Sequence, residues 1–365
     1  MSLNAKALAP GTLVSLSDTN GNEIGTAMFN PQSLICARIL SREISSTIDT
    51  SWIAARLVSA LNLRNRMFQV PYYRLVHAEA DGLPGLIIDR FDETCVVQLN
   101  TAGMELLSSN IIEALKNTIS PKTIIIQRQG GARMLEGLDA APIDITGNYS
   151  GPTRLEENDN TFLIDLLEGQ KTGWFFDHRE NRLRAALLSQ GHRMADIYSY
   201  VGGFGLQGAV KGASEVLFVD RSKRALNLAS KAAEIAKVEN RCQFMKADAF
   251  TALEDLNTHK ERFGVVIADP PAFVRTKKDL KSGRRGYRKL AGLAARIVEQ
   301  NGILCIASCS HHVDVKMFTE DVNKGVVDAR RNAILLHVGG AAPDHPVHPA
   351  LPESSYLKCL FLKLD

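Results

Sequence analysis

The sequence predicts an α/β protein whose C-terminal half is a doubly wound, largely parallel sheet of seven strands. Two observations carry this prediction. From about residue 194 onward, apolar segments of strand length alternate with helical segments across short connections, as in a parallel sheet that is covered on both faces. The last two strand patterns are separated only by residues 339–354, a stretch with four prolines that is too short for a crossover helix. The final strand is therefore expected to run antiparallel.

The elements of this half are expected in strict alternation after a domain boundary near Gly169. The expected strands are 194–200, 215–220, 242–247, 264–269 and 303–308, with two more at 333–338 and 356–363. The expected helices are 204–211, 223–237, 249–257, 287–300 and 313–323.

The N-terminal half is expected to contain two smaller parts. Residues 1–44 hold three short strand patterns, at 12–16, 25–29 and 36–40, which are too few for an independent barrel. Residues 45–168 are expected to form a small α+β module. Its helical patterns lie at 49–62 and near 105–117, its strand patterns at 73–78, 86–89, 95–99 and 123–127, and a connector at 130–160, rich in Gly, Pro, Asn and Asp, is expected to contain a hairpin and to end in 162–167.

The composition excludes several classes of protein. With 45% hydrophobic and 23% charged residues, the chain of 365 residues is neither disordered nor collagen-like. Its longest apolar runs fall short of the roughly 18 residues of a membrane span, so we expect a cytoplasmic protein with no membrane partner. No cysteine has metal-ligand spacing, so no metal is expected. Buried, inert side chains are expected for Cys36, Cys95, Cys242, Cys305 and Cys359.

Polar residues and glycines follow the expected strands at the edge where open α/β sheets bind ligands. The first strand leads into Tyr198-Ser199-Tyr200-Val201-Gly202-Gly203, where glycines allow a ligand to approach the backbone at a helix start. Asp220 ends the second strand and suits two ribose hydroxyls, and Asp248 follows the third and suits an adenine amino group. Alone, each acid is better explained as a helix cap. Together with Asp269 after the fourth strand, they favour a ligand site.

A GxGxxG pattern spans residues 203–208, with Asp220 seventeen residues after its first glycine. This pattern alone leaves a NAD-dependent oxidoreductase open as an alternative. The fourth strand, however, ends in Asp269-Pro270-Pro271-Ala272, where two prolines stiffen the turn and direct Asp269 toward a planar, hydrogen-bonding target. The fifth strand ends in Ser308-Cys309-Ser310, close to an expected helix start that favours a thiolate. A dehydrogenase needs neither feature.

Residues 275–289 form a basic segment with eight Lys and Arg, offset within the segment by Asp279 alone. In isolation, such a run is best explained as a solvated loop. Because it directly follows the Asp269 turn, contacts with the phosphates of a substrate are favoured instead. The candidate phosphate-binding residues, which become RNA-binding residues under the resemblance described next, are Arg275, Lys277, Lys278, Lys281, Arg284, Arg285 and Arg288.

These motifs together resemble the RlmI family of 23S ribosomal RNA large-subunit methyltransferases. The matching stretches are DGLPGLIIDRF (81–91), KTGWFFDHRENR (171–182), YSYVGGFG (198–205), DPPAF (269–273), SCS (308–310) and DHPVHPALPESSYLK (344–358). The resemblance implies a PUA domain at 1–44, here truncated, a central α+β domain at 45–168, and a Rossmann-like class I methyltransferase domain at 169–365. It also implies methyl transfer from S-adenosyl-L-methionine to carbon 5 of a cytosine in 23S ribosomal RNA.

The sequence departs from the family pattern in two places. The basic start of the PUA domain is absent, and Ala272 stands where the better-known RNA cytosine-5 methyltransferases have a second cysteine. The group that removes the C5 proton is therefore not identified by its motif.

The chemistry requires a nucleophile that attacks C6 of the base, which we assign to Cys309, while Asp269 would bind the N3/N4 edge. Three alternatives remain: an RNA methyltransferase acting on C5 of uracil or on an exocyclic nitrogen, the NAD-dependent oxidoreductase, and a non-catalytic RNA-binding assembly factor. The oligomeric state, including a homodimer, also stays open. The candidate cofactor-binding residues are Phe175, Asp177, Arg179, Tyr198, Ser199, Tyr200, Gly202, Gly203, Asp220, Asp248, Ala249, Asp269 and Pro270.

Overall fold

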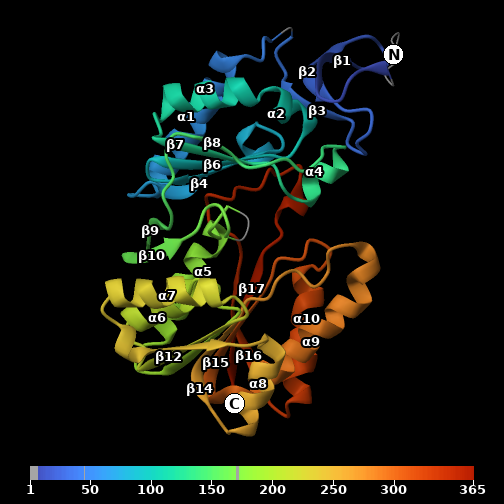
Figure 1. Cartoon of the computed structure of the whole chain (residues 1–365). Helices are drawn as coiled ribbons and strands as arrows, with labels where there is room; N and C mark the ends of the chain where they lie inside the picture. Colours follow the sequence, from blue (N-terminus) through green and yellow to red (C-terminus); the bar gives the residue numbers. More distant parts are fainter. Residues whose placement is uncertain (1–6, 45, 170–171) are drawn as a thin grey trace. The chain divides into compact units, whose positions relative to one another are not determined.

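A computed structural model of the chain describes residues 7–44, 46–169 and 172–365 (Figure 1). Contacts divide the chain into two units that are each discontinuous in sequence. Unit 1 comprises Met1–Gly151, Asp165–Trp174 and Pro343–His348, and unit 2 comprises Pro152–Ile164, Phe175–Ala342 and Pro349–Asp365. None of the helices described is both long enough and apolar enough to cross a membrane.

The first part of unit 1 is a small antiparallel sheet in the order β1-β2-β3. Its strands are β1 (Thr12–Ser17), β2 (Glu23–Phe29) and β3 (Ala37–Ser41), as the sequence predicts. Met28 and Leu40 belong to the hydrophobic cluster that also fills the rest of unit 1. The three strands therefore do not have a separate core of their own.

The second part of unit 1 is a five-stranded sheet in the order β4-β5-β6-β7-β8, in which only β6 and β7 are parallel. The helix expected near 105–117 is confirmed as α3 (Ser108–Thr118), and a break at Leu107 separates it from a short helix, α2 (Ala102–Leu106), which was not expected. The strands are β4 (Tyr72–His77), β5 (Leu86–Phe91), β6 (Thr94–Leu99), β7 (Thr123–Gln127) and β8 (Asp144–Thr146), and the helices are α1 (Thr50–Met67), α2 (Ala102–Leu106), α3 (Ser108–Thr118) and α4 (Gly131–Leu135).

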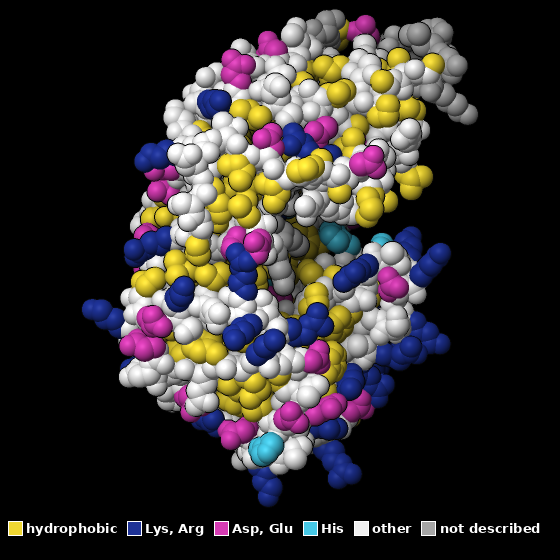
Figure 2. All heavy atoms as spheres, viewed as in Figure 1, with side chains coloured by type: hydrophobic (Ala, Val, Ile, Leu, Met, Phe, Trp, Pro, Cys, Tyr) yellow, Lys and Arg dark blue, Asp and Glu magenta, His cyan; other side chains and the backbone are white. Residues whose placement is uncertain are grey.

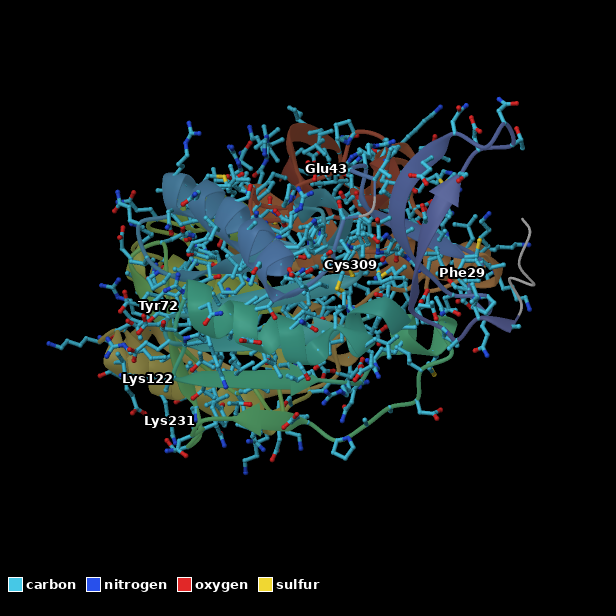
Figure 3. All side chains as sticks on the ribbon, turned by 90° about the horizontal axis from the view of Figure 1, so that it is seen from above. Phe29, Glu43, Tyr72, Lys122, Lys231 and Cys309 are labelled. Carbon is cyan, nitrogen blue, oxygen red and sulfur yellow. The ribbon has the colours of Figure 1, made fainter. Side chains whose placement is uncertain are left out.

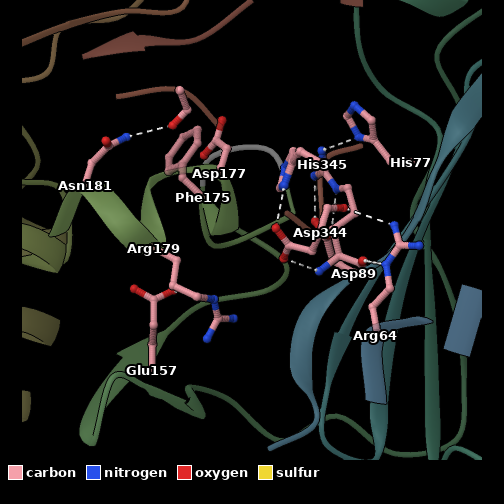
Figure 4. Close-up of polar contacts among 12 residues, drawn as sticks. Arg64, His77, Asp89, Glu157, Phe175, Asp177, Arg179, Asn181, Asp344 and His345 are labelled. Carbon is pink, nitrogen blue, oxygen red and sulfur yellow. Dashed lines mark hydrogen bonds and ion pairs between the residues drawn. The ribbon is translucent and has the colours of Figure 1, made fainter. Parts of the chain in front are cut away.

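A buried ionic cluster fixes the segment 343–348 within unit 1. Arg64 is fully buried, forms a bidentate pair with Asp81 at 2.5 and 2.8 Å, and donates to the carbonyl of Asp344 at 3.1 Å. The carboxylate of Asp344 accepts from the backbone N–H of Arg74 at 3.0 Å and lies 2.9 Å from Nδ1 of His345 (Figure 4). A buried guanidinium is tolerated only when it is paired. Asp344, which is 280 residues from Arg64 in the sequence, is therefore part of the core of unit 1.

Unit 2 contains the predicted seven-stranded sheet, in the order β13-β12-β11-β14-β15-β17-β16. The first five strands of this order are parallel, and β17 is antiparallel to both of its neighbours, so the expected reversal of the final strand is confirmed. The strands are β11 (Arg193–Ile197), β12 (Glu215–Asp220), β13 (Cys242–Lys246), β14 (Phe263–Ala268), β15 (Val298–Ser308), β16 (Ala333–Gly339) and β17 (Lys358–Leu364).

Helices connect the parallel strands of this sheet. The main difference from expectation is α9, which begins at Leu280 rather than near residue 287, so the second half of the basic segment is helical. The helices are α5 (Arg179–Leu188), α6 (Gly203–Val210), α7 (Lys223–Ile235), α8 (Ala249–Thr258), α9 (Leu280–Ile297) and α10 (Val315–Asp328). The hairpin expected in the connector is formed by β9 (Thr153–Glu157) and β10 (Asn160–Ile164), and it contacts α6 and α7 within unit 2.

The cysteines are buried in most of the expected places. Cys95, Cys305 and Cys359 are buried, and Cys242 is half-buried. The prediction is wrong for Cys36, which is exposed because it lies in the turn that precedes β3.

Candidate active site

The sheet order of unit 2 brings the carboxyl ends of β13, β12, β11, β14 and β15 into one row. Parallel strands end at the same edge of a sheet, which is where open α/β proteins bind their ligands. Asp248, Asp220, Asp269 and Cys309 each lie at or just after one of these ends. The candidate residues therefore come from neighbouring strands.

The loop after β11 has an unusual backbone. Tyr198 and Tyr200 have positive φ angles of 65° and 50°, and Gly202 has φ 82°. A left-handed conformation strains a residue with a side chain by about 1–3 kcal/mol, and such strain concentrates at functional sites. The glycines were expected to let a ligand approach the backbone. Gly202 and Gly205 are also required for packing, because a Cβ atom at either position would collide with the ring of Phe218.

Asp196, a residue that the sequence analysis missed, connects β11 to the first turn of α6, which follows this loop. It is buried at the end of β11 and accepts a hydrogen bond from the backbone N–H of Gly205 at 2.8 Å. Burial raises the pKa of Asp196 to about 7, against the effect of that hydrogen bond, and the nearby Asp269 raises it further. A single acid within an apolar strand pattern was a signal in the sequence.

Asp220 holds the same loop from β12. Its carboxylate accepts from the backbone N–H of Tyr200 at 2.9 Å and from that of Ser222 at 2.7 Å. Each carboxylate oxygen carries two lone pairs, so these bonds leave acceptor capacity for ribose hydroxyls. Asp220 does not cap α7, because the side chain of Ser222 does so.

Asp248 does cap a helix. It is the N-cap residue of α8, and its Oδ1 accepts from the backbone N–H groups of Phe250 and Thr251 at 3.0 and 3.4 Å. Burial raises the pKa of the Tyr198 hydroxyl, and Asp248 raises it further, which indicates that the two side chains are near one another. Asp248 is exposed, whereas Ala249 after it is buried as the first residue of the helix.

Asp269 is paired with a histidine that the sequence analysis did not single out. Nε2 of the buried His178 lies 3.3 Å from Oδ1 of Asp269, whose side chain is 28% exposed. Burial acts to lower the pKa of His178, but the charge and hydrogen bond of Asp269, with a further contribution from Asp177, outweigh it and raise the pKa to about 9. The imidazole is therefore protonated at neutral pH and orients the carboxylate. Pro270, the next residue, is buried.

The segment before α5 is held by buried polar contacts (Figure 4). Asp177 accepts from the hydroxyl of Tyr356 at 2.5 Å, and the ring of Phe175 lies edge-on to that of Tyr200 at 6.0 Å. The buried Arg179 lies 4.0 Å from the buried Glu157 of the β9–β10 hairpin, which also pairs with Arg182. Asp177, a candidate cofactor-binding residue, is thus bonded to the segment that precedes β17.

Cys309 lies in a turn that a buried tyrosine holds on both sides. The hydroxyl of Tyr287 accepts from Ser308 Oγ at 2.9 Å and lies 2.7 Å from Ser310 Oγ. Ser310 Oγ in turn accepts from the backbone N–H of Val274 at 3.2 Å, so the turn is bonded to the loop that follows Asp269. Cys309 itself, which is labelled in Figure 3, is half-buried.

The basic segment divides into two groups. Arg284 and Arg288 each form a bidentate pair across to α10, with Asp321 at 2.7 and 3.0 Å and with Asp328 at 2.6 and 2.8 Å. Lys and Arg side chains gather over α9 and the segment before it (Figure 2). Besides Arg288, the exposed members are Arg275, Lys277, Lys278, Lys281, Arg285 and Lys289, of which Lys289 pairs with Glu254 at 3.3 Å.

The sheet order, the reversed last strand and the acids at the strand ends define a class I S-adenosylmethionine-dependent methyltransferase. Residues 134–361 match the family of S-adenosylmethionine-dependent methyltransferases. Residues 2–42 match a family of PUA-like domains. "Ribosomal RNA large subunit methyltransferase I" of Escherichia coli (strain K12) is 33% identical over 355 residues, which cover 95% of this chain and 89% of that protein. The chain therefore belongs to the ribosomal RNA large subunit methyltransferase I family.

Other relatives agree with this assignment. The protein of the same name from Shigella dysenteriae serotype 1 is also 33% identical over 95% of this chain and 89% of its own length. The crystal structure of SMU.776, a putative methyltransferase complexed with SAH, has a TM-score of 0.84 at 20% identity and covers 99% of this chain and 93% of that chain. A putative SAM-dependent methyltransferase from Streptococcus mutans has a TM-score of 0.83 at 19% identity, with the same two coverages. These two structures show that the fold is shared.

The residues at the strand ends fit S-adenosylmethionine. Ser199 Oγ is buried in the strained loop and has no hydrogen-bond partner among the residues that the structure describes. An unsatisfied buried hydroxyl is costly and is expected where a ligand completes the site. Asp220 and Asp248 add carboxylates that can accept from hydroxyl and amino groups at the same edge of the sheet.

Proposed function

We propose that the chain transfers the methyl group of S-adenosylmethionine to carbon 5 of a cytosine in 23S ribosomal RNA of the large subunit, through a covalent adduct with Cys309. The names of the relatives support the RNA substrate. The observation that carries the base chemistry is the turn of Cys309, which is hydrogen-bonded to the loop after Asp269. A methyltransferase acting on an exocyclic nitrogen has no use for a thiol held there.

The proposed reaction makes and breaks bonds at C5 and C6 of the cytosine. The Cys309 thiolate attacks C6, so that an S–C6 bond forms and the electrons of the C5–C6 double bond become available at C5. S-adenosylmethionine supplies an electrophilic methyl group. C5 takes the methyl group as S-adenosylhomocysteine leaves, and C5 then loses its proton to a general base. The S–C6 bond breaks, the thiolate leaves and the C5–C6 double bond is restored. Asp269, oriented by His178, accepts from the N4 amino group of the base.

The same proposal assigns the remaining candidates. The strained loop, including Gly203 at the start of α6, would hold the cofactor with Asp220 and Asp248, and Phe175 would close one side of it. The exposed cations from Arg275 to Arg285 would hold the phosphates that flank a base taken out of its stack. We also propose the three-domain division 1–44, 45–168 and 169–365, which the PUA-like match at 2–42 supports.

A mechanism-based trap tests the covalent step. RNA that carries 5-fluorocytosine lacks the C5 proton, so the adduct should persist after methyl transfer and give a cross-linked band. Cys309→Ala should lose both the band and turnover but should retain cofactor binding in calorimetry. Cys305→Ala is the matched control, because it also removes one thiol, here from within β15, and it should retain the band.

Two outcomes would contradict the assignment. A band that persists in Cys309→Ala and disappears in another cysteine variant would move the nucleophile. Full turnover by Cys309→Ala, with no band in either protein, would favour a nitrogen acceptor instead.

A further inference from the structure

Lys358 is a buried lysine beside the turn that holds Cys309. It opens β17, is paired in register with Ser308 of β15, and is only 4% exposed. Lysine is almost never fully buried unless its ammonium group is paired. The proposed function as stated above gives Lys358 no role.

The amine of Lys358 is fixed by two backbone carbonyls. Nζ donates to the carbonyl of Ser310 at 2.7 Å and to that of Tyr356 at 2.8 Å. A neutral amine has two N–H groups and one lone pair, and an ammonium has three N–H groups. The two carbonyls therefore accept from both N–H groups of the neutral amine and from two of the three N–H groups of the ammonium. The third position carries a lone pair in the amine and a proton in the ammonium.

The environment keeps both protonation states of Lys358 accessible. Burial lowers the pKa of Lys358 to about 8, while Cys309 and Asp314 act to raise it. Tyr287 faces the same turn from α9, where burial raises the pKa of its hydroxyl and Cys309 adds to that effect. Among the residues that the structure describes, Cys309 and Asp314 are thus the titratable groups whose charges act on this amine, and Tyr287 faces the turn of Cys309.

Building on the proposed function, we propose that Lys358 accepts the proton of the Cys309 thiol when the nucleophile is activated. The S–H bond breaks and an N–H bond forms at the third position of Nζ, which leaves a thiolate beside an ammonium group. The thiolate then attacks C6, and the proton can return to sulfur when the thiolate is released from the adduct. No oxidant, reductant or other reactant is needed, and the C5 proton leaves to a different acceptor.

The pH dependence of Cys309 alkylation tests this proposal without RNA or methyl transfer. The full chain is treated with iodoacetamide over a range of pH, and modification of the Cys309 peptide is measured by mass spectrometry. Lys358→Gln keeps two N–H donors for the two carbonyls but removes the ionisable amine. We expect it to raise the midpoint pH of alkylation by about one to three units, because a thiolate loses its adjacent cation.

Tyr287→Phe is the matched control, since it disturbs the same turn without changing a charge. We expect its alkylation midpoint to stay near that of the unmodified protein. An unchanged midpoint in Lys358→Gln would overturn the proposal, and so would an equal shift in Tyr287→Phe. These results are independent of 5-fluorocytosine trapping, so failure of this proposal is distinguishable from failure of the proposed function.

A reciprocal measurement covers the case in which Lys358→Gln does not fold, as judged by calorimetry with S-adenosylhomocysteine. Cys309→Ser replaces the thiol by a group that does not ionise in this range. Acetylation of Lys358 by acetic anhydride, followed by mass spectrometry, should then show a lower midpoint pH than in the unmodified protein. Identical midpoints in the two proteins would show that the groups are not coupled and would overturn the proposal.

Discussion

The pair between His178 and Asp269 predicts a loss of stability at alkaline pH. An unfolded histidine titrates near 6.5, whereas the pKa of His178 in the folded protein is raised to about 9. Between these values the folded state binds more protons than the unfolded state, so its stability falls as the pH rises. The contribution is complete below pH 6.5 and is lost as the pH passes through about 9.

The size of this contribution follows from the two pKa values. At about 1.4 kcal/mol per pH unit, the difference between 6.5 and about 9 corresponds to about 3–4 kcal/mol. Asp269 is 28% exposed, and water screens part of the interaction, so we expect about 1.5–3 kcal/mol.

The assay compares the native protein with His178→Gln by urea unfolding, followed by circular dichroism, from about pH 6 to about pH 9.5. The difference in unfolding free energy between the two proteins should be largest at the acidic end and should shrink toward the alkaline end. Other titrating groups cancel in this difference. A difference that stays constant across the range, or grows with pH, would refute the reasoning.

Histidine NMR provides an independent readout of the same pair. The resonance that disappears in His178→Gln identifies His178, and it should titrate near pH 9. His77 in unit 1 is the internal contrast, because burial, together with Arg74 and His345, lowers its pKa to about 2. Its resonance should not move over the range in which His178 titrates.

Two further predictions concern binding. Asp220→Ala should weaken S-adenosylmethionine binding by about 1.5–3 kcal/mol in calorimetry, the range for hydrogen bonds to a charged group, whereas Ser222→Ala removes only the cap of α7 and should leave the affinity unchanged. Equal affinities in all three proteins would leave Asp220 as a residue that holds the loop. Charge reversal at Lys281 and Arg285 should reduce the slope of log K for RNA binding against log salt concentration by about 0.7–0.9 for each phosphate that is no longer neutralised. Arg284→Met removes the pair with Asp321, so it should lower the melting temperature and leave this slope unchanged. A salt slope that is the same in the charge-reversal variant would make this surface a solvated one.

The architecture of unit 2 was predictable because it depends on regular patterns. Alternating apolar and helical segments specify a parallel sheet, and the prolines between 339 and 354 exclude a final crossover helix. The boundary of α9 was not predictable in the same way. The charges from Lys281 to Arg285 suggest a loop when only the sequence is considered. In the structure, Arg284 and Arg288 of this helix pair with acids on α10, about 40 residues later in the chain.

The site was predictable only to the level of strand ends. Asp220, Asp269 and Cys309 follow strand patterns, so the sheet order brings them to one edge. The support of these residues comes from elsewhere in the chain. His178 reaches Asp269 from a segment about 90 residues earlier, and no local pattern connects the two residues.

Backbone strain was also invisible in the sequence. Glycine-rich motifs suggest left-handed residues at glycines, yet Tyr198 and Tyr200 adopt this conformation in the loop after β11. Tertiary hydrogen bonds to Ser199 and Tyr200 from the side of β12 hold them there, and these bonds exist only once β11 and β12 are paired. Local propensity therefore accounts for the left-handed Gly202 but not for the two tyrosines.

The contact between Arg64 and Asp344 also determines when unit 1 can finish folding during synthesis. These residues are 280 positions apart in the sequence, and a ribosome that adds about 5–20 residues per second needs roughly 15–55 s to pass from one to the other. During that interval the guanidinium has Asp81, but the backbone N–H of Arg74 has yet to meet the Asp344 carboxylate. Unit 1, although it holds the first strands to be synthesised, is thus completed only after β16 and the segment 343–348 have been made.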